Sequence, residues 1–215
     1  MPRILSGDEL EVVRAEIGAA AARLYARGGL DAITMRDLAK VIGRSPMGLY
    51  RYFRDRDEIV AWLRTDAFNR FSDALETAFA SGSDSFARAR AVGRAYLDFA
   101  LKNPESYRLM FDMRQPDDSR YPALTEAAAR ADKTVTRHVI DLASAGIVHG
   151  DPEVIGHALW AAAHGVVVLH LAGRMPAGKN VQDFYMDTMR IAFRGARAEI
   201  QTQKKGKSAW PSKAH

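Results

Sequence analysis

No cysteine occurs among the 215 residues of the chain, and this absence excludes several classes of protein at once. Without thiols there is no disulfide framework, no cysteine-ligated zinc or iron–sulfur cluster, and no thiol catalysis. The first residues also lack an apolar segment long enough for a signal peptide, so we expect a cytoplasmic protein. Hydrophobic residues make up 47% and charged residues 27%, which is the balance of a folded globular protein.

Runs of β-branched residues are scarce, whereas alanine is abundant and apolar residues recur every three or four positions. That period is typical of amphipathic helices, so the sequence predicts an all-α fold of about nine helices. Thr34 and Asp37 form a capping-box pattern that starts a helix. Ser45 followed by Pro46 marks a second start, and Asp55 marks a third. The expected helices cover residues 8–27, 36–41, a short stretch from 46, 55–80, 84–102, 105–112, 123–145, 152–172 and 181–201, with a loop over 114–122.

The two short helices are separated by Gly43 and a tight turn, which is the layout of a helix-turn-helix. With the preceding helix they form a three-helix unit. We therefore expect a helix-turn-helix domain over residues 1–56, a larger helical domain over 57–201, and a basic, disordered tail over 202–215. A break in composition at residues 81–84 marks a second candidate for the boundary between the N-terminal module and the larger helical domain.

Positive charge is concentrated in short segments of the chain, whose formal net charge is +5. Residues 34–56 hold six Arg or Lys residues against two Asp residues, and residues 201–215 hold four Lys residues and no acidic one. One basic segment in an otherwise mildly acidic body indicates a localised anionic partner. Judged on charge alone, a three-helix core with solvated arginines is an equally good explanation.

The basic segment carries a specific motif, Gly-x-Ser-x-x-x-Leu-Tyr-x-Tyr-Phe, at residues 43–53. Together with the glycines at 28–29 and the run Thr-Met-Arg-Asp-Leu-Ala at 34–39, it resembles the DNA-binding domain of the tetracycline-repressor (TetR) family. A second, weaker pattern is similar to the subgroup of that family marked by a Trp-His-Gly (WHG) signature. It comprises residues 103–111 together with Trp160, His164 and Gly165.

The resemblance implies a three-helix DNA-binding domain followed by a larger helical domain that binds a small-molecule effector and forms a homodimer, with no cofactor. The second short helix would lie in the major groove of duplex DNA. The residues at matching phosphate-contacting positions are Thr34, Tyr50, Tyr52 and Arg56. Those at base-contacting positions are Arg36, Pro46, Met47, Gly48 and Arg51. Ser45 at the helix start and Arg44 in the turn complete the expected DNA-binding set.

Two positions depart from the family pattern. Arg44 takes the place of an apolar residue, usually Val, in the turn, where its side chain either extends into solvent or reaches a phosphate; we favour the phosphate. Arg56 replaces the usual Lys, which keeps the charge but changes its geometry. Because a positive charge at the start of a helix opposes the helix dipole, we expect a phosphate contact to explain Arg56.

The resemblance also implies an effector pocket and a dimer interface in the larger domain. Aromatic residues around a polar histidine fit a mostly apolar effector, although ordinary core packing explains each residue singly. The expected effector-binding residues are Tyr96, Phe99, Tyr107, Met110, Phe111, Trp160 and His164. Small and apolar residues on the last two helices allow two subunits to pack closely. The expected dimer interface comprises Ala158, Ala161, Ala162, Gly165, Phe184, Met189, Phe193 and Ala196.

Two alternatives from other classes remain open. An enzyme would use the helical cavity, but no nucleophile turn is visible, and the histidines lack metal-ligand spacing, so we expect no metal site. The second alternative is a helical interaction protein or a membrane-surface protein. Residues 155–171 have about the length needed to span a bilayer, but three histidines interrupt them. The preferred interpretation is a DNA-binding transcription regulator. In its simplest form it is a repressor of a partly palindromic operator that is released by effector binding.

Overall fold

The computed structural model describes residues 7–112 and 118–197. Within these ranges it contains nine α-helices, two short 3₁₀ helices and no strand, which confirms the predicted all-α class. The elements are α1 (Gly7–Gly28), η1 (Leu30–Ala32), α2 (Met35–Ile42), α3 (Pro46–Leu49), α4 (Arg56–Ser81), α5 (Ser85–Lys102), α6 (Pro104–Met110), η2 (Asp118–Arg120), α7 (Pro122–Ser144), α8 (Pro152–Leu171) and α9 (Val181–Arg197). The predicted tail over 202–215 lies outside the described residues, as do 114–117 and 198–201.

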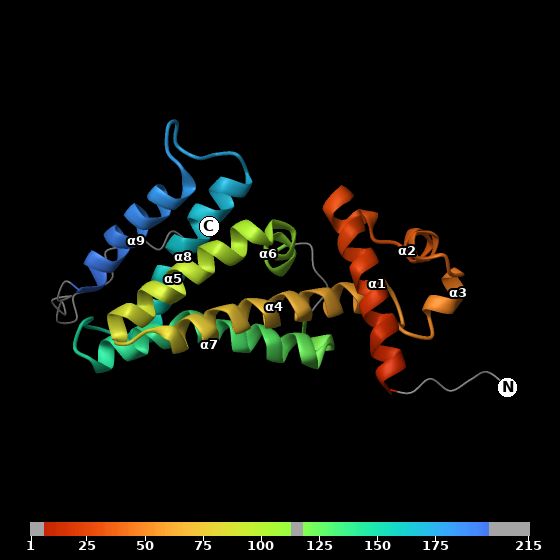
Figure 1. Ribbon diagram of the computed structural model, residues 1–215, viewed down its shortest axis with the longest axis horizontal. Coiled ribbons are helices and arrows are strands. Elements are labelled where there is room, and N and C mark those ends of the chain that lie inside the picture. Colours follow the sequence, from red (N-terminus) through yellow and green to blue (C-terminus); the bar gives the residue numbers. More distant parts are fainter. Residues whose placement is uncertain (1–6, 113–117, 198–215) are drawn as a thin grey trace, which may run out of the picture.

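The long helix α4 joins two groups of helices. α1, α2 and α3 gather at one end of the molecule, and α5 to α9 build the other end (Figure 1). α7 runs alongside α4 over much of its length, and the two make extensive contact (Figure 1). The arrangement therefore agrees with a small helix-turn-helix unit followed by a larger helical body.

The predicted helix starts are held by side-chain caps. Thr34, Ser45 and Asp55 each accept a hydrogen bond from the amide three residues further on, at 3.0, 3.1 and 2.8 Å. Such caps satisfy amides that have no partner inside the helix and are worth about 1 kcal/mol each. Asp37 does not complete the capping box through a backbone amide, because its carboxylate accepts the Thr34 hydroxyl at 2.6 Å instead. α2 ends at Gly43, whose φ of 69° lies in the left-handed region that favours glycine.

A first hydrophobic core holds α1, α2, α3 and the beginning of α4 together. Ile17 on α1, Leu38 on α2 and Leu49 on α3 are completely buried in it. Each such side chain contributes about 1.5–3 kcal/mol relative to exposure, so these contacts fix how the short helices lie on α1. The remaining buried members are Ala20, Ala21, Leu24, Tyr25, Leu30, Ile33, Ala39, Tyr52, Phe53, Ile59, Val60, Leu63 and Leu109.

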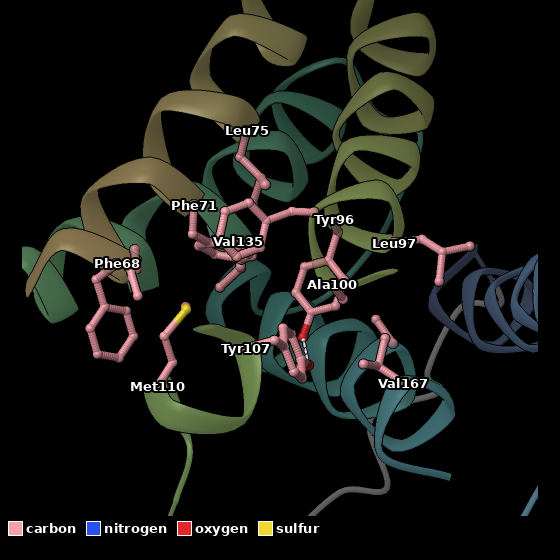
Figure 2. Packing of buried hydrophobic residues seen from close by; sticks show 14 of the residues in the cluster. Phe68, Phe71, Leu75, Tyr96, Leu97, Ala100, Tyr107, Met110, Val135 and Val167 are labelled. Atoms are coloured by element: carbon pink, nitrogen blue, oxygen red, sulfur yellow. Dashed lines mark hydrogen bonds between the residues drawn. The ribbon is translucent and has the colours of Figure 1, made fainter. Parts of the chain in front are cut away.

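A second, larger core fills the space between α4, α5, α6, α7 and α8 (Figure 2). The ring of Phe71 on α4 packs edge-on against Tyr96 and Phe99 on α5, with centroids 5.4 and 5.3 Å apart. Such edge-to-face pairs add about 0.5–1.5 kcal/mol to the burial of the rings. The larger body is therefore built around an aromatic core.

The two cores meet in α4 and α6. Ile59 and Leu63 of α4 belong to the first core, although the sequence interpretation ended the first domain at residue 56. In α6, Leu109 is buried in the first core, whereas Tyr107 and Met110 are buried in the second. α6 therefore connects the core of the helix-turn-helix unit to the aromatic core of the body.

An ion pair between a buried arginine of α4 and a partly exposed aspartate fastens η2 to α4. The guanidinium of Arg64, a residue only 6% exposed, forms a two-pronged pair with the carboxylate of Asp118 in η2. One amino group of Arg64 also donates to the backbone oxygen of Met110 at 3.4 Å. A single side chain of α4 thus holds both the end of α6 and the start of η2.

α1 packs tightly against α4 at Gly18. A Cβ atom placed there would lie 2.1 Å from an atom of the Trp62 ring, so only glycine fits without moving the ring. We expect Gly18→Ala to lower the free energy of unfolding by about 1–3 kcal/mol, the usual cost of overpacking. That loss exceeds the gain of about 1 kcal/mol in helix propensity. Urea unfolding followed by circular dichroism measures the difference.

Gly93 on α5 provides the matched control. A Cβ atom at this position has its nearest neighbour, the hydroxyl of Tyr185, at 3.9 Å, which is an ordinary van der Waals contact. Gly93→Ala is expected to raise the free energy of unfolding by about 0.5–1 kcal/mol. Equal stabilisation by both substitutions would show that Trp62 moves aside at no cost and that Gly18 is not required by packing.

Candidate nucleic-acid interface

α2 and α3 lie on the outer side of α1, away from the larger body (Figure 1). Their apolar side chains Leu38, Ala39 and Leu49 point into the first core. The opposite side carries exposed groups, including Met47, which is 76% exposed, and Tyr50, which is 51% exposed. An apolar side chain as exposed as Met47 contributes little to folding, so this surface is available to a partner.

The exposed surface of α2 and α3 is basic, and much of its charge is not neutralised by the residues that the structure describes. Arg36, Lys40 and Arg51 are exposed, and none of them forms an ion pair with another described residue. Arg44 lies on the same surface and pairs with Glu16 at 3.3 Å, a contact between exposed groups. Exposed pairs of this kind are worth about 0–1 kcal/mol, so Arg44 can exchange Glu16 for another anion. Lys40 was not among the predicted contacts, although its position on α2 was visible in the helical period.

Arg56 has a structural partner that the sequence did not reveal. Its Nε donates to the backbone oxygen of Ile33 at 2.8 Å, and its Nη2 donates to the backbone oxygen of Leu30. A third contact joins it to Asp57 at 3.4 Å. The side chain thereby ties the start of α4 to the turn between α1 and α2. The helix-dipole argument for a phosphate at Arg56 is therefore not needed, and a phosphate contact at this residue stays a prediction.

The two tyrosines of the motif have different surroundings. Tyr50 is exposed next to Met47, as a DNA-contacting residue requires. Tyr52 is only 8% exposed and its ring belongs to the first core, with the guanidinium of Arg44 at 5.8 Å from the ring centroid. Its main physical role is packing. Thr34, also a predicted phosphate contact, is half-buried and caps α2.

The predicted effector-binding residues come together in the second core. Tyr96, Tyr107 and Met110 are buried (Figure 2). Phe99 is buried as well, whereas Phe111, Trp160 and His164 are half-buried. Burial raises the pKa of Tyr96 to about 12 and raises that of Tyr107 as well, so both phenols are neutral. Burial also lowers the pKa of His164 below its usual value.

Two clefts lie outside this aromatic cluster. One of about 230 Å³ opens between α1, α4 and α6, where Trp62 faces Gly18 and polar residues such as Arg70 and Glu105. The other, about 580 Å³, lies at the far ends of α4, α5 and α7 and is lined by Arg88, Arg137 and other residues. Neither cleft is lined by the predicted effector residues, which in this structure pack against one another. No group of three or more potential metal ligands was found in residues 7–112 and 118–197.

The predicted dimer residues separate into two sets. On α8, Ala158 and Ala161 are exposed and nothing lies within 4 Å of the Cβ position of Gly165. On α9, however, Ala196 is only 9% exposed and Phe193 packs on the third, smaller core between α7, α8 and α9. Phe184 and Met189 also pack inward, and Ala162 is half-buried.

The outward apolar residues of α9 are ones that the sequence interpretation missed. Ile191 is 71% exposed and Met186 is 41% exposed, and Val154 and Val168 on α8 are exposed as well. α8 has the length and the mean hydropathy, 1.6, of a membrane-spanning helix, and 33% of that segment is buried. An exposed apolar face across two neighbouring helices is also what a subunit interface requires, so the hydropathy of α8 has a second explanation.

Comparison with known proteins extends this description. The family model described as bacterial regulatory proteins, tetR family, matches residues 17–62. The family model described as the tetracyclin repressor-like C-terminal domain matches residues 89–191. The HTH-type transcriptional regulator Rv1816 of Mycobacterium tuberculosis is 28% identical over 149 residues. This alignment covers 67% of the present chain and 61% of the length of that relative.

Solved structures show the same fold. A protein of unknown function from Rhodococcus sp. RHA1 superposes with a TM-score of 0.76 at 26% identity, covering 92% of this chain and 99% of that one. The TetR family transcriptional regulator PfmR from Thermus thermophilus superposes with a TM-score of 0.66 at 18% identity, covering 83% and 97%. One family model spans the helix-turn-helix unit and the other spans most of the helical body. The chain therefore belongs to the tetracycline-repressor (TetR) family of bacterial regulatory proteins.

Proposed function

We propose that the protein is a cytoplasmic, homodimeric transcription regulator that binds a partly palindromic DNA operator through α2 and α3. The observation that carries the proposal is the exposed basic surface, where Arg36, Lys40 and Arg51 have no acidic partner within the described residues. A phosphate backbone neutralises such charges and releases counterions, which favours binding. The family membership and the family-model match over residues 17–62 support the same function.

The operator contacts divide by chemistry. Arg36 and Arg51 can form two-pronged hydrogen bonds with guanine, whereas Met47 and Pro46 can contact only apolar groups such as the thymine methyl. Gly48 allows the backbone to approach a base edge. We keep Thr34, Ser45, Tyr50, Tyr52, Arg44 and Arg56 as the proposed phosphate-side set. Within it, the exposed residues Tyr50 and Arg44 are the best placed for phosphate contact in this conformation.

Binding of a small, mostly apolar effector in the larger body is proposed to weaken the operator complex. α6 supports this coupling, because Tyr107 lies in the aromatic cluster and Leu109 lies in the core beneath α2 and α3. An effector can act only through a difference in affinity between the two conformations of the dimer. Trp160, His164 and Gly165 further support placing the larger domain in the Trp-His-Gly subgroup.

Selection of bound sequences from random DNA duplexes tests this function directly. The expected product is an inverted repeat whose half-sites lie about 34–36 Å apart, or a multiple of that distance, with affinity that falls steeply as salt is raised. Footprinting of the full chain on the selected duplex then gives the register. Enrichment of no sequence, together with a flat salt response, would contradict the proposal.

Arg36 is expected to provide much of the base discrimination. It is exposed at the first turn of α2, and the short α3 offers no other long hydrogen-bonding side chain among residues 46–49. Arg36→Ala is expected to cost about 1–3 kcal/mol of specific affinity and to relax the preference at one operator position. Fluorescence anisotropy on the selected duplex and on its single-base variants measures both effects.

Arg90→Ala is the matched control, because Arg90 is an exposed arginine on α5 in the larger body. It is expected to leave operator affinity unchanged. If Arg36→Ala weakened the selected duplex and a random duplex equally, Arg36 would bind a phosphate and the base contact would be wrong.

A further inference from the structure

A chain of hydrogen bonds runs through the aromatic cluster from α8 to α5, on to α6 and back to α8. The indole nitrogen of Trp160 donates to the hydroxyl of Tyr96 at 3.1 Å. The hydroxyls of Tyr96 and Tyr107 lie 2.6 Å apart (Figure 2). The hydroxyl of Tyr107 lies 2.6 Å from Nδ1 of His164. Both tyrosine rings are buried, so each hydroxyl needs a partner inside the protein.

Only one direction of donation satisfies every group in this chain. An indole nitrogen carries a hydrogen and cannot accept, so the Tyr96 oxygen is an acceptor from Trp160. The hydrogen of Tyr96 then has Tyr107 as its one partner among the described residues. The hydrogen of Tyr107 in turn goes to His164. Nδ1 of His164 is therefore an acceptor and carries no hydrogen.

The consequence for His164 is a fixed tautomer. A neutral imidazole without a hydrogen on Nδ1 carries it on Nε2. This Nε2 makes no hydrogen bond with another described residue, and the His164 side chain is half-buried. Around it stand the half-buried rings of Phe111 and Trp160, with centroids 4.8 and 5.9 Å from that of His164. The N–H group at Nε2 of His164 is therefore a hydrogen-bond donor flanked by aromatic rings.

The same series of hydrogen bonds disfavours a positively charged imidazole at His164. Protonation of Nδ1 would force Tyr107 to accept from His164 and to donate to Tyr96. The Tyr96 oxygen would then receive two hydrogen bonds, and its own hydrogen would be buried without an acceptor. A buried donor without a partner costs about 1–3 kcal/mol, so the network resists the positive charge that a carboxylate ligand would induce.

We propose that the effector site takes an uncharged, largely apolar molecule whose carbonyl oxygen accepts a hydrogen bond from Nε2 of His164. The inference rests on the proposed function, because it names the ligand class of the proposed effector site. Ketones, esters and amides with a hydrophobic body have the required acceptor, and their apolar part packs on Phe111 and Trp160. Carboxylates and amines are the disfavoured relatives.

The first test is the tautomer of His164 in the full, ligand-free protein. Nitrogen-15 spectra of the imidazole side chains are expected to show Nδ1 of His164 as an unprotonated nitrogen and Nε2 as a protonated one. Tyr107→Phe removes the donor and is expected to return His164 to a mixture of tautomers. Tyr185→Phe is the control, because the Tyr185 hydroxyl donates to the backbone oxygen of Gly93 at 2.9 Å and takes no part in the hydrogen-bond network of His164. A protonated Nδ1 in the unmodified protein overturns the proposal.

The second test compares three probes of nearly the same shape: benzylacetone, hydrocinnamate and isopentylbenzene. Benzylacetone is expected to bind about tenfold more tightly than either relative, the value of one hydrogen bond, and to shift the Nε2 signal of His164. Equal or tighter binding of hydrocinnamate, or no binding of benzylacetone, contradicts the ligand class. Both tests use protein without DNA, so their failure leaves operator selection intact. Failure of operator selection, in turn, leaves the tautomer and probe results standing.

Discussion

Ala161→Glu is expected to convert the dimer into monomers and to abolish high-affinity operator binding. Ala161 lies on the exposed face of α8, in line with Ala158 and Gly165, and a glutamate there would bury one carboxylate per subunit in the proposed interface. An unpaired charge buried in this way costs about 3–5 kcal/mol, which raises the dissociation constant of the dimer about a thousandfold. Because a monomer contacts a single half-site, the affinity for the operator falls when the dimer dissociates. Sedimentation velocity and anisotropy measure the two effects.

Ala129→Glu supplies the control for this substitution. Ala129 is an exposed alanine on α7, so the same glutamate there changes the net charge equally but lies outside the proposed interface. Ala129→Glu is expected to leave both the sedimentation of the dimer and its affinity for the operator unchanged. A dimer that tolerates Ala161→Glu would mean that the two subunits meet through another surface.

Asp118→Ala is expected to have the largest effect on stability. It leaves the guanidinium of Arg64 buried beside α6, where the backbone oxygen of Met110 is its one remaining hydrogen-bond partner among the described residues. Removing one partner of a buried ion pair costs about 3–5 kcal/mol of unfolding free energy. We expect a loss of about 3 kcal/mol, the low end of that range, because the Asp118 side chain is 39% exposed. Urea unfolding is expected to show a lower midpoint with an unchanged slope.

The double variant Arg64→Met/Asp118→Ala separates charge from packing. Replacing the arginine by an apolar side chain of similar length removes the unpaired charge, so the double variant is expected to be more stable than Asp118→Ala alone. For comparison, Arg190→Ala breaks an exposed pair with Asp187 and is expected to cost less than about 1 kcal/mol. If Asp118→Ala cost no more than Arg190→Ala, the Arg64 pair would not hold the segment after α6.

The parts of the fold that could be predicted depend on contacts between near neighbours in sequence. Thr34, Ser45 and Asp55 cap helices three residues away, and Gly43 ends α2 by its own conformation, so each signal is complete within a few residues. The periodicity that gave the nine helices is equally local. The exposure of Met47 and Tyr50 depends on the same kind of information, because the motif at 43–53 sets the turn and the short helix that carries them; their contact with DNA stays a prediction.

The remaining features depend on residues distant in the sequence. Arg64 and Asp118 are separated by 54 positions, and Tyr96 and Trp160 by 64, so no local pattern indicates that they meet. The face that a helix buries is also decided by its neighbours. Successive residues point about 100° apart, so the packing of α9 alone determines that Ile191 faces outward while Phe193 faces inward.

The burial of Leu109 in the core of the helix-turn-helix unit limits how this protein can be divided. A fragment that ends after α4 would lack Leu109, which is buried in the first core. The apolar side chains that Leu109 covers would then be exposed to solvent. A chimeric regulator that joins the helix-turn-helix unit to the effector domain of another protein therefore has to include α6 of this chain. Grafting only the first 56 residues is expected to yield an insoluble product.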